Sequence, residues 1–374
     1  METLFFYGTL RYQPLLDLVM GQAHNLRVTQ AQLPEHEVLW AKGESFPMIR
    51  PAKGGCARGV LIEGVDAAFL KRLDFYEGGF AYTLRDVMVD VNGRQVSAQV
   101  YFPEEGLWTP GAPWSLAQWE GDWGDITLYA AREVMGYYGH LDAGEVARRF
   151  PMIRARAATR VRAAQSAPTT LRANSGPEDL SIRETRQPYS NYFTLEEQDI
   201  AFRRFDGEMS DTVTRAGFIG IDAVTVLPYD PVRDRVLVIE QFRFGPHVRG
   251  DPKPWVLEPV AGRIDAGESP EDCAHRETLE EAGLRLQSLQ EIARYYPSPG
   301  AFSEFLISYV AIADLPDGAA RVAGLAQEDE DIRGHVLSFD RLMELVSSGE
   351  AGCGPLVLSA FWLSQNRARL GWSP

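Results

Sequence analysis

Hydrophobic and polar residues alternate in short stretches over the first hundred residues, a pattern typical of half-buried strands. Gly- and Pro-containing turns separate these stretches, which read TLFFYGTL, RGVLIEGV, YTLRDVMVDV and VSAQVYF; the turn NGR joins the last two. Beyond residue 106 the apolar spacing becomes helical, and tryptophan is frequent up to about residue 164. We therefore predict a strand-rich domain over residues 1–105, followed by a helical extension over residues 106–164.

The next segment, residues 165–179, is rich in Ser, Thr, Pro, Ala and Asn and has no periodicity, which indicates a linker. Alternation begins again near residue 180, with the strand candidates YFTLEEQDIAFRRF, AVTVLPYD, RVLVIEQFRF and EFLISYVAIA. Two helical patterns close the chain. Because no internal repeat relates the halves, residues 180–374 are predicted to form a second and different domain.

One helix of the second domain has clear start and stop signals. Ser269 is a typical N-cap, a proline and two acidic residues follow it, and Gly283 is a typical stop. Within this helix Glu277, Glu280 and Glu281 are spaced i, i+3 and i+4, so their carboxylates share one stripe. Like charges at this spacing destabilise an isolated helix by about 0.2–0.5 kcal/mol per pair. By itself, such a stripe is typical of a solvated face.

The face opposite the acidic stripe is predicted to pack on a sheet. Leu279 lies on that side, flanked by the small residues Thr278 and Ala282, which allow a close approach.

Length and composition narrow the class of protein. A chain of 374 residues exceeds the roughly 250–300 at which one core stops growing, so two domains are expected. The hydrophobic fraction of 45% is ordinary for a globular protein, and the net charge of -15 argues against nucleic acid or an anionic membrane as partner. The chain has three cysteines, far apart, and neither an export signal nor a long apolar run. We therefore expect a cytoplasmic protein without a disulfide framework.

The acidic helix and the residues before it resemble the Nudix box, G-x5-E-x7-R-E-U-x-E-E-x-G-U. Thr278 departs from the pattern, because an aliphatic residue is usual there. The resemblance implies a Nudix hydrolase domain, an α/β/α sandwich with a mixed sheet. The matching positions are Gly262, Glu268, Arg276, Glu277, Glu280, Glu281, Gly283 and Leu284.

The likeness extends beyond the box to the bacterial ADP-ribose pyrophosphatase branch. It includes the stretches DPVRDRVLVIEQFRF, PWVLEPVAGRID, YYPSPGAFSE and GLAQEDEDIRGHVLSFDRLMELVSSG, with Pro299 at the place where this branch carries a proline. The branch implies hydrolysis of ADP-ribose to AMP and ribose 5-phosphate. Nucleoside diphosphate sugar relatives share parts of this scaffold, so hydrolysis of GDP-mannose or ADP-glucose is the nearest alternative.

The resemblance also implies a metal site for Mg²⁺, with Mn²⁺ as the alternative ion. Glu277 and Glu281 would bind the metal together with the main-chain carbonyl of Ala261. Glu280 would be a further ligand or a catalytic supporting group. Carboxylates suit such an ion because it prefers hard oxygen ligands.

The stretch AQEDEDIRG resembles the mobile catalytic loop of the family. On this basis Glu328 would orient or deprotonate the attacking water, and Glu330 would complete the metal site. An acidic loop without the family resemblance is more often simply solvated.

An acidic protein needs local arginines to bind an anionic substrate. Arg243 in EQFRF and Arg215 in TVTRAGF are the candidates, since the planar guanidinium donates two parallel hydrogen bonds to phosphate. Tyr189 matches the place where this branch stacks an aromatic ring on adenine; the alternative is a strand residue that packs on the core. The branch also implies a homodimer through the Nudix domain.

The first domain carries a separate resemblance. The stretch FFYGTLR predicts a strand end and a tight turn, and SFPMI, KGGCARGVL and LKRLDFYEGGFAYTLRDVMV follow it in the order seen in gamma-glutamylcyclotransferase-like proteins. This likeness covers residues 3–104 and implies a small α+β domain, a β-barrel with helices. Tyr7, Gly8, Thr9 and Leu10 would form the substrate-binding loop, and Glu77 would be the general acid and base.

A carboxylate that transfers protons near neutral pH needs a raised pKa and a partly apolar setting. Phe75, Tyr76, Phe80 and Tyr82 are close to Glu77 in sequence and are the candidates for that setting. The alternative is that Glu77 caps the turn of a hairpin.

Three alternatives compete with the ADP-ribose hydrolase as a description of the whole chain. The Nudix domain can be a sensor that binds a nucleotide but no longer hydrolyses it. The first domain can be the principal enzyme, a gamma-glutamyl cyclotransferase with an accessory Nudix domain. The first domain can also be a scaffold that stabilises the dimer.

Overall fold

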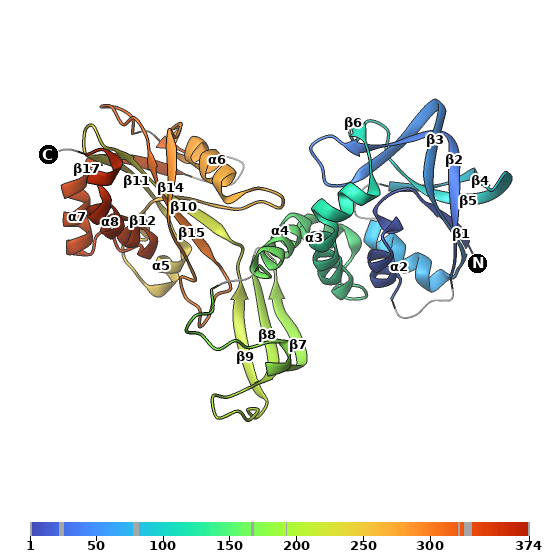
Figure 1. The fold of residues 1–374 in the computed structure, drawn as a ribbon, viewed down its shortest axis with the longest axis horizontal. Coiled ribbons are helices and arrows are strands. Elements are labelled where there is room, and N and C mark those ends of the chain that lie inside the picture. Colours follow the sequence, from blue (N-terminus) through green and yellow to red (C-terminus); the bar gives the residue numbers. More distant parts are fainter. Residues whose placement is uncertain are drawn as a thin grey trace. The chain divides into compact units, whose positions relative to one another are not determined.

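The computed structural model describes residues 2–21, 26–77, 82–165, 168–191, 193–320, 322–324 and 331–372 (Figure 1). The chain divides into two compact units, Met1–Ala167 and Pro168–Pro374. Phe80, Glu328 and Glu330 lie outside the described residues.

The first unit is built on a closed barrel of five strands. Neighbouring strands follow the order β3-β1-β5-β4-β2, and pairing of β2 with β3 closes the ring. The predicted turn between β4 and β5 is present, with Asn92 and Gly93 at φ values of 54° and 83°. These strands are β1 (Glu2–Phe6), β2 (Arg27–Ala41), β3 (Pro47–Val65), β4 (Tyr82–Val91) and β5 (Arg94–Pro103), with β6 (Pro110–Pro113) added to β2.

Helices cover this barrel, as the resemblance implied. α1 (Gln13–Met20) and α2 (Ala67–Glu77) lie in the region where only strands were predicted from the residues, because short apolar runs do not distinguish a buried helix from a strand. α3 (Leu116–Gly136) and α4 (Ala143–Ala163) follow. Trp119 of α3 is fully buried in the same core as Leu4 and Leu15, so residues 116–136 pack into this unit.

The second unit contains a mixed sheet between two layers of helices, as predicted for a Nudix domain. β10 pairs with β15 in parallel, and the other pairings of the sheet are antiparallel. Its strands are β10 (Ala223–Asp230), β11 (Arg235–Phe242), β12 (Trp255–Glu258), β13 (Val260–Arg263), β14 (Ser288–Tyr295), β15 (Leu306–Ile312), β16 (Val322–Ala323) and β17 (Ile332–Ser338).

Side chains that alternate along β10 reach two separate cores. Val224 and Val226 pack with residues of α6 (Pro270–Ala282), whereas Leu227 and Tyr229 pack with residues of α7 (Phe339–Ser348) and α8 (Gly354–Asn366). This alternation follows from the period of two in a strand. It places α6 on one face of the sheet and α7 and α8 on the other.

A second, three-stranded antiparallel sheet belongs to the same unit, and α5 (Phe244–Arg249) follows β11. Strand β8 lies in the middle of this small sheet. Its strands are β7 (Leu180–Ser190), β8 (Thr194–Phe202) and β9 (Val213–Ile219). Of the helices in the described ranges, none is both long and apolar enough to cross a bilayer.

Candidate functional site

Helix α6 begins and ends where its sequence predicts. The Oγ of Ser269 accepts a hydrogen bond of 3.0 Å from the backbone N–H of Asp272, and Gly283 ends the helix in the left-handed conformation with φ of 63°. Both caps satisfy backbone groups that a helix end leaves without partners. The acidic residues after these caps are therefore held in a fixed helical register.

The buried face of α6 agrees only in part with the predicted one. Thr278 and Ala282 are buried as predicted, but Leu279 is 45% exposed, so the expectation that it packs on the sheet is wrong. The helix also buries Glu281 of the acidic stripe, together with Cys273 and Ala274. Thr278 donates from its Oγ1 to the carbonyl of Ala274 at 2.7 Å, and this bond satisfies the hydroxyl at the position where an aliphatic residue is usual.

Glu281 connects α6 to strand β13. Its side chain is buried, with only 3% of the residue exposed, and its Oε2 accepts a 3.0 Å hydrogen bond from the backbone N–H of Ala261. A buried carboxylate is costly unless it has such partners. The structure thus brings together two residues of the predicted metal site, Ala261 and Glu281, which are far apart in the sequence.

Gly262, at the first position of the box, leaves space for the side chain of Glu277. A Cβ atom added there would lie 1.9 Å from the Cδ of Glu277, so the Glu277 carboxylate would have to move. Because glycine has no Cβ, the carboxylate of Glu277 lies directly against the backbone of β13. The structure therefore places Glu277 beside the same strand that Glu281 contacts.

Arg276 forms hydrogen bonds with three acidic residues of the box, Glu268, Glu277 and Glu280. Its Nε donates to Oε1 of Glu268 at 2.8 Å, and its Nη1 donates to Glu277 at 2.6 Å and to Glu280 at 3.2 Å. Burial raises the pKa of Glu268, but the hydrogen bonds from Arg276 and from the backbone N–H of Asp265 outweigh burial and hold this pKa below its usual range. Repulsion among the carboxylates is relieved here by one guanidinium.

The side-chain and main-chain oxygen atoms at this site are of the type that a hard divalent cation prefers as ligands. Glu277, Glu280, Glu281 and the main chain at Ala261 offer oxygen atoms, and Gly262 provides the space that brings them together. In the described part of the chain, however, no three His, Cys, Asp or Glu side chains form a group arranged to hold a metal ion. In this arrangement Glu277 and Glu280 engage Arg276 instead.

A groove of about 650 Å³ lies elsewhere in the second unit and contains Arg215, from β9, together with Pro299. The rings of Phe218 and Phe302 stack in its lining, with centroids 5.3 Å apart and planes inclined by 19°. The structure thus brings one predicted substrate arginine together with the branch-specific proline. The aromatic pair was not predicted, because no spacing in the sequence relates residues 218 and 302.

The other two predicted substrate contacts lie outside this groove. Arg243 donates from its Nε to Oε2 of Glu258 at 2.7 Å. Tyr189 is 56% exposed on β7 and does not line the groove; its exposure also shows that it does not pack in the core.

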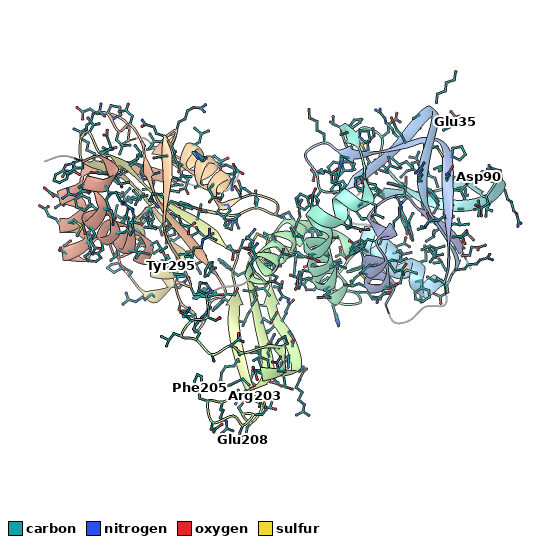
Figure 2. The ribbon with its side chains drawn as sticks, viewed as in Figure 1. Glu35, Asp90, Arg203, Phe205, Glu208 and Tyr295 are labelled. Atoms are coloured by element: carbon teal, nitrogen blue, oxygen red, sulfur yellow. The ribbon has the colours of Figure 1, made fainter. Side chains whose placement is uncertain are left out.

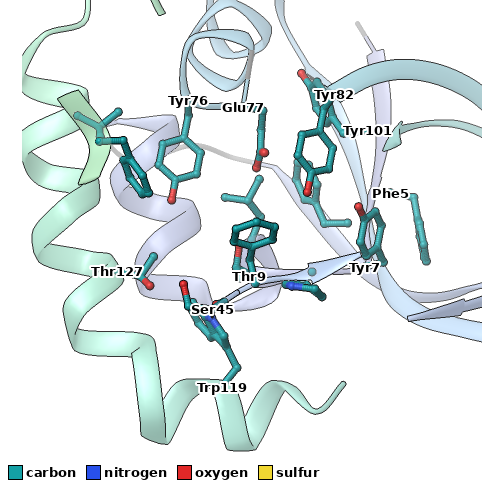
Figure 3. Close-up of a pocket in the computed structure, with 17 residues that line it drawn as sticks. Phe5, Tyr7, Thr9, Ser45, Tyr76, Glu77, Tyr82, Tyr101, Trp119 and Thr127 are labelled. Carbon is teal, nitrogen blue, oxygen red and sulfur yellow. Dashed lines mark hydrogen bonds between the residues drawn. The ribbon is translucent and has the colours of Figure 1, made fainter. Parts of the chain in front are cut away.

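The first unit contains a cavity of about 140 Å³ lined by the predicted loop residues Tyr7, Gly8, Thr9 and Leu10 and by Glu77. Figure 3 shows the Glu77 carboxyl group pointing into the space between Tyr76 and Tyr82. Glu77 is the last residue of helix α2, so the alternative of a hairpin glutamate is wrong. The structure brings the four predicted loop residues and Glu77 into one cavity.

Burial among aromatic side chains raises the pKa values of the ionisable groups in this cavity. Burial raises the pKa of Glu77 to about 7. Burial also raises the pKa of the Tyr76 and Tyr82 phenols, so both remain neutral hydroxyls beside the carboxyl group. Tyr76 and Tyr82 thus provide the apolar setting expected for them, whereas Phe75 does not line the cavity and packs edge-on against Tyr138.

Several lining residues were not predicted from the sequence. The frequent tryptophans of the helical segment were the one sign in the sequence that this segment packs against another surface. They did not indicate which surface it covers. The additional residues are Phe5, Phe6, Ser45, Phe46, Pro47, Tyr101, Trp119, Thr127, Val134 and Phe150.

Comparisons with known proteins divide the chain in the same way. The family described as "Gamma-glutamyl cyclotransferase, AIG2-like" matches residues 4–124, and the family described as "NUDIX domain" matches residues 221–351. An "ADP-ribose pyrophosphatase" of Escherichia coli (strain K12) is 37% identical over 203 residues, which are 54% of this chain and 96% of that protein.

A second relative and a solved structure each match about half of the chain. A "GDP-mannose pyrophosphatase" of Escherichia coli O1:K1 / APEC is 32% identical over 176 residues, which are 47% of this chain and 90% of that protein. A structure described as "Crystal structure of ADP compounds hydrolase" is 22% identical, covers 50% of this chain and 97% of its own, and has a TM-score of 0.38.

Proposed function

Because the chain belongs to the Nudix family of hydrolases and has an ADP-ribose pyrophosphatase among its relatives, we propose that it hydrolyses the diphosphate of ADP-ribose to AMP and ribose 5-phosphate. One observation carries this proposal: α6 and β13 bring Glu277 and Glu281 against the backbone at Ala261 and Gly262, where the missing Cβ of the glycine leaves space for the Glu277 carboxylate. This arrangement serves oxygen ligation of an ion rather than core packing.

In this proposal Glu277, Glu281 and the Ala261 carbonyl hold Mg²⁺, or Mn²⁺ in its place, and Glu280 supports them. When bound, the ion supplies charge stabilisation for the diphosphate and its leaving oxygen. Arg276 holds the carboxylates in register before the ion binds, through its bonds to Glu277 and Glu280.

Substrate binding and water activation are assigned to other residues. Arg243 and Arg215 donate to the phosphate oxygens, because a guanidinium matches their geometry. Tyr189, exposed on β7, stacks on the adenine ring. Glu328 takes a proton from the attacking water, and Glu330 completes the metal site.

A substrate panel tests this function. ADP-ribose, GDP-mannose and ADP-glucose are incubated with the full chain and Mg²⁺, and the products are identified by chromatography. We expect AMP and ribose 5-phosphate from ADP-ribose at the highest kcat/KM. Faster cleavage of GDP-mannose would reassign the substrate, which the 32% identical relative keeps open. Binding of ADP-ribose without release of AMP would instead favour a sensor.

We also propose that the protein is a cytoplasmic homodimer that assembles through the second unit. The small sheet exposes large apolar side chains, including Leu180 at 52%, Ile182 at 53% and Phe202 at 39%, and Phe205 projects from the loop beyond β8 (Figure 2). All three cysteines are free thiols, which suits a reducing compartment. Light scattering should give twice the 41.7 kDa mass of the chain; a monomer mass would contradict the dimer.

A second candidate function, gamma-glutamyl cyclotransferase, rests on Glu77. The γ-glutamyl compound would bind with its α-amine near this carboxyl group. The ionised Glu77 takes a proton from the amine nitrogen as that nitrogen bonds to the γ-carbonyl carbon. It then donates the proton to the leaving amine as the amide C–N bond breaks and 5-oxoproline forms. The pKa of about 7 makes both transfers feasible near neutral pH.

Release of 5-oxoproline from γ-glutamyl peptides tests this second function. The wild-type chain should release it, and Glu77→Gln should abolish the release while ADP-ribose hydrolysis persists. If the wild-type chain releases none, the first unit is better described as a scaffold.

A further inference from the structure

Part of the wall of the Glu77 cavity comes from beyond the segment that resembles cyclotransferases. The family match ends at residue 124, whereas Thr127 and Val134 of α3 and Phe150 of α4 line the cavity. Figure 3 shows Thr127 projecting from its helix toward the cavity, on the side of Tyr76. We call these three residues the helical wall.

Helix α3 is fixed to the barrel near both of its ends. Near its start, the Nε1 of the fully buried Trp119 donates to the carbonyl of Ser45 at 2.8 Å. Just beyond its end, the ring of Tyr138 lies 5.4 Å from that of Phe75 and 5.0 Å from the guanidinium carbon of Arg72, both on α2. The helix that carries Thr127 and Val134 therefore does not move independently of the barrel.

Helix α4 is fixed in turn to α3. Arg156 is 3% exposed and donates to both carboxylate oxygens of Glu133, from Nε at 3.3 Å and from Nη2 at 2.5 Å. Loss of one partner of such a buried pair is strongly destabilising, because it leaves the other charge buried without a counter-charge. Val134, Val146 and Phe150 add apolar contacts between the two helices. Phe150 is thus part of a rigid wall and not of a hinged lid.

We propose that the helical wall limits the size of the group that the substrate carries on its γ-amide nitrogen, with Phe150 as the specificity-determining residue. This inference rests on the second candidate function above. Tyr76, the neighbour of Glu77, packs in the same cluster as Val134 and Phe150, so the wall lies next to the reacting carboxyl group. The cavity of about 140 Å³ is close to the ~150 Å³ of an apolar cavity that holds one benzene. A γ-glutamyl group has more non-hydrogen atoms than benzene, so it fills this cavity and brings the amine portion of the substrate against the helical wall.

Two γ-glutamyl amides of different size test the proposal on the full chain. We compare kcat/KM for 5-oxoproline release from γ-glutamyl-ethylamide and from γ-glutamyl-benzylamide. The wild type should prefer the ethylamide. Phe150→Ala should shift the ratio toward the benzylamide by about tenfold or more, since a change of pocket volume by one or more methylenes is worth roughly 10–200-fold in discrimination.

Val146→Ala is the matched control. Val146 lies one turn earlier on α4, is 3% exposed and packs in the same cluster, but it does not line the cavity. This variant should leave the ratio unchanged. Phe150→Leu should shift the ratio in the same direction by less, and it keeps the test decisive if the alanine variant fails to fold.

The outcomes separate this inference from the function on which it rests. If the wild type releases 5-oxoproline but neither Phe150 variant changes the ratio, or Val146→Ala changes it equally, the wall does not determine size and the inference is overturned. If the wild type releases none from either amide, both the inference and the cyclotransferase proposal are overturned.

Discussion

The two units place carboxyl groups in opposite surroundings. In the first unit Glu77 faces neutral tyrosines in an apolar cavity, and its pKa rises to about 7. In the second unit Glu268 is half-buried, and hydrogen bonds from Arg276 and a backbone N–H hold its pKa below the usual range against the effect of burial. The contrast shows that burial raises the pKa of a carboxyl group unless hydrogen-bond donors and a positive charge stabilise its ionised form.

This difference suits two kinds of chemistry. A carboxyl group with a pKa near neutrality exchanges protons readily, as acid–base catalysis requires. A set of carboxylates that share an arginine as hydrogen-bond partner can exchange that cation for a metal ion, which prefers the same oxygen atoms. The following predictions test the contrast, beginning with the largest expected effect.

Removing one charge from the box should nearly abolish ADP-ribose hydrolysis. Glu281→Gln retains the size of the side chain but removes the anionic oxygens, and we expect kcat/KM to fall by about 10³-fold, in line with the several kcal/mol that metal-ion catalysis supplies. AMP release at saturating Mg²⁺ measures the effect, and Glu344→Gln, at an exposed ion pair, is the control. Unchanged turnover in Glu281→Gln would overturn the assigned site.

Filling the space beneath Glu277 should also reduce activity, by a smaller factor. In Gly262→Ala the added Cβ collides with the Glu277 carboxylate and displaces it from β13. We expect a loss of about 10²-fold in kcat/KM, because misplacing a catalytic group by about 1 Å typically costs this much. A matched substitution is Gly245→Ala, where an added Cβ meets no atom within 4 Å. Equal activities of the two variants would contradict the prediction.

The stability of the first unit should fall as pH rises. Between pH 4.5 and about 7 the folded state keeps the Glu77 proton that the unfolded chain has lost, so the free energy of unfolding decreases over this range, by about 3 kcal/mol in total. Glu77→Gln should remove this decrease. Urea unfolding of both proteins at pH 5 and pH 8 measures it, and identical pH dependence in the two would refute the assigned titration.

The second unit should show a smaller effect of opposite sign. Because the pKa of Glu268 is lowered on folding, its stabilising contribution is present above the usual glutamate pKa and is lost as pH falls through the folded pKa. Glu268→Gln should therefore destabilise this unit at pH 7 by about 1.5–3 kcal/mol, the range for a hydrogen bond to a charged group, and by less at low pH. A destabilisation that is equal at both pH values would contradict the ionic contribution.

Much of the second unit was predictable because its signals are local. The cap at Ser269, the stop at Gly283 and the spacing of Glu277 and Glu281 depend on a few consecutive residues, and the helix forms where they indicate. Leu279 was misplaced because periodicity predicts which residues share a face, but not which face meets the sheet.

The sequence by itself determined the two-part organisation and the start and end of the acidic helix, because turns, caps and spacings depend on a few consecutive residues. The barrel and sandwich classes and the candidate site residues followed from the resemblance of the sequence to known families. Only the tertiary structure decided the protonation of Glu77, the space that Gly262 leaves for Glu277 and the wall that ends at Phe150. The physical reason is that desolvation and close contact depend on every atom within a few ångströms. Those atoms belong to segments far apart in the sequence, such as those of Phe5, Glu77 and Phe150, which line one cavity.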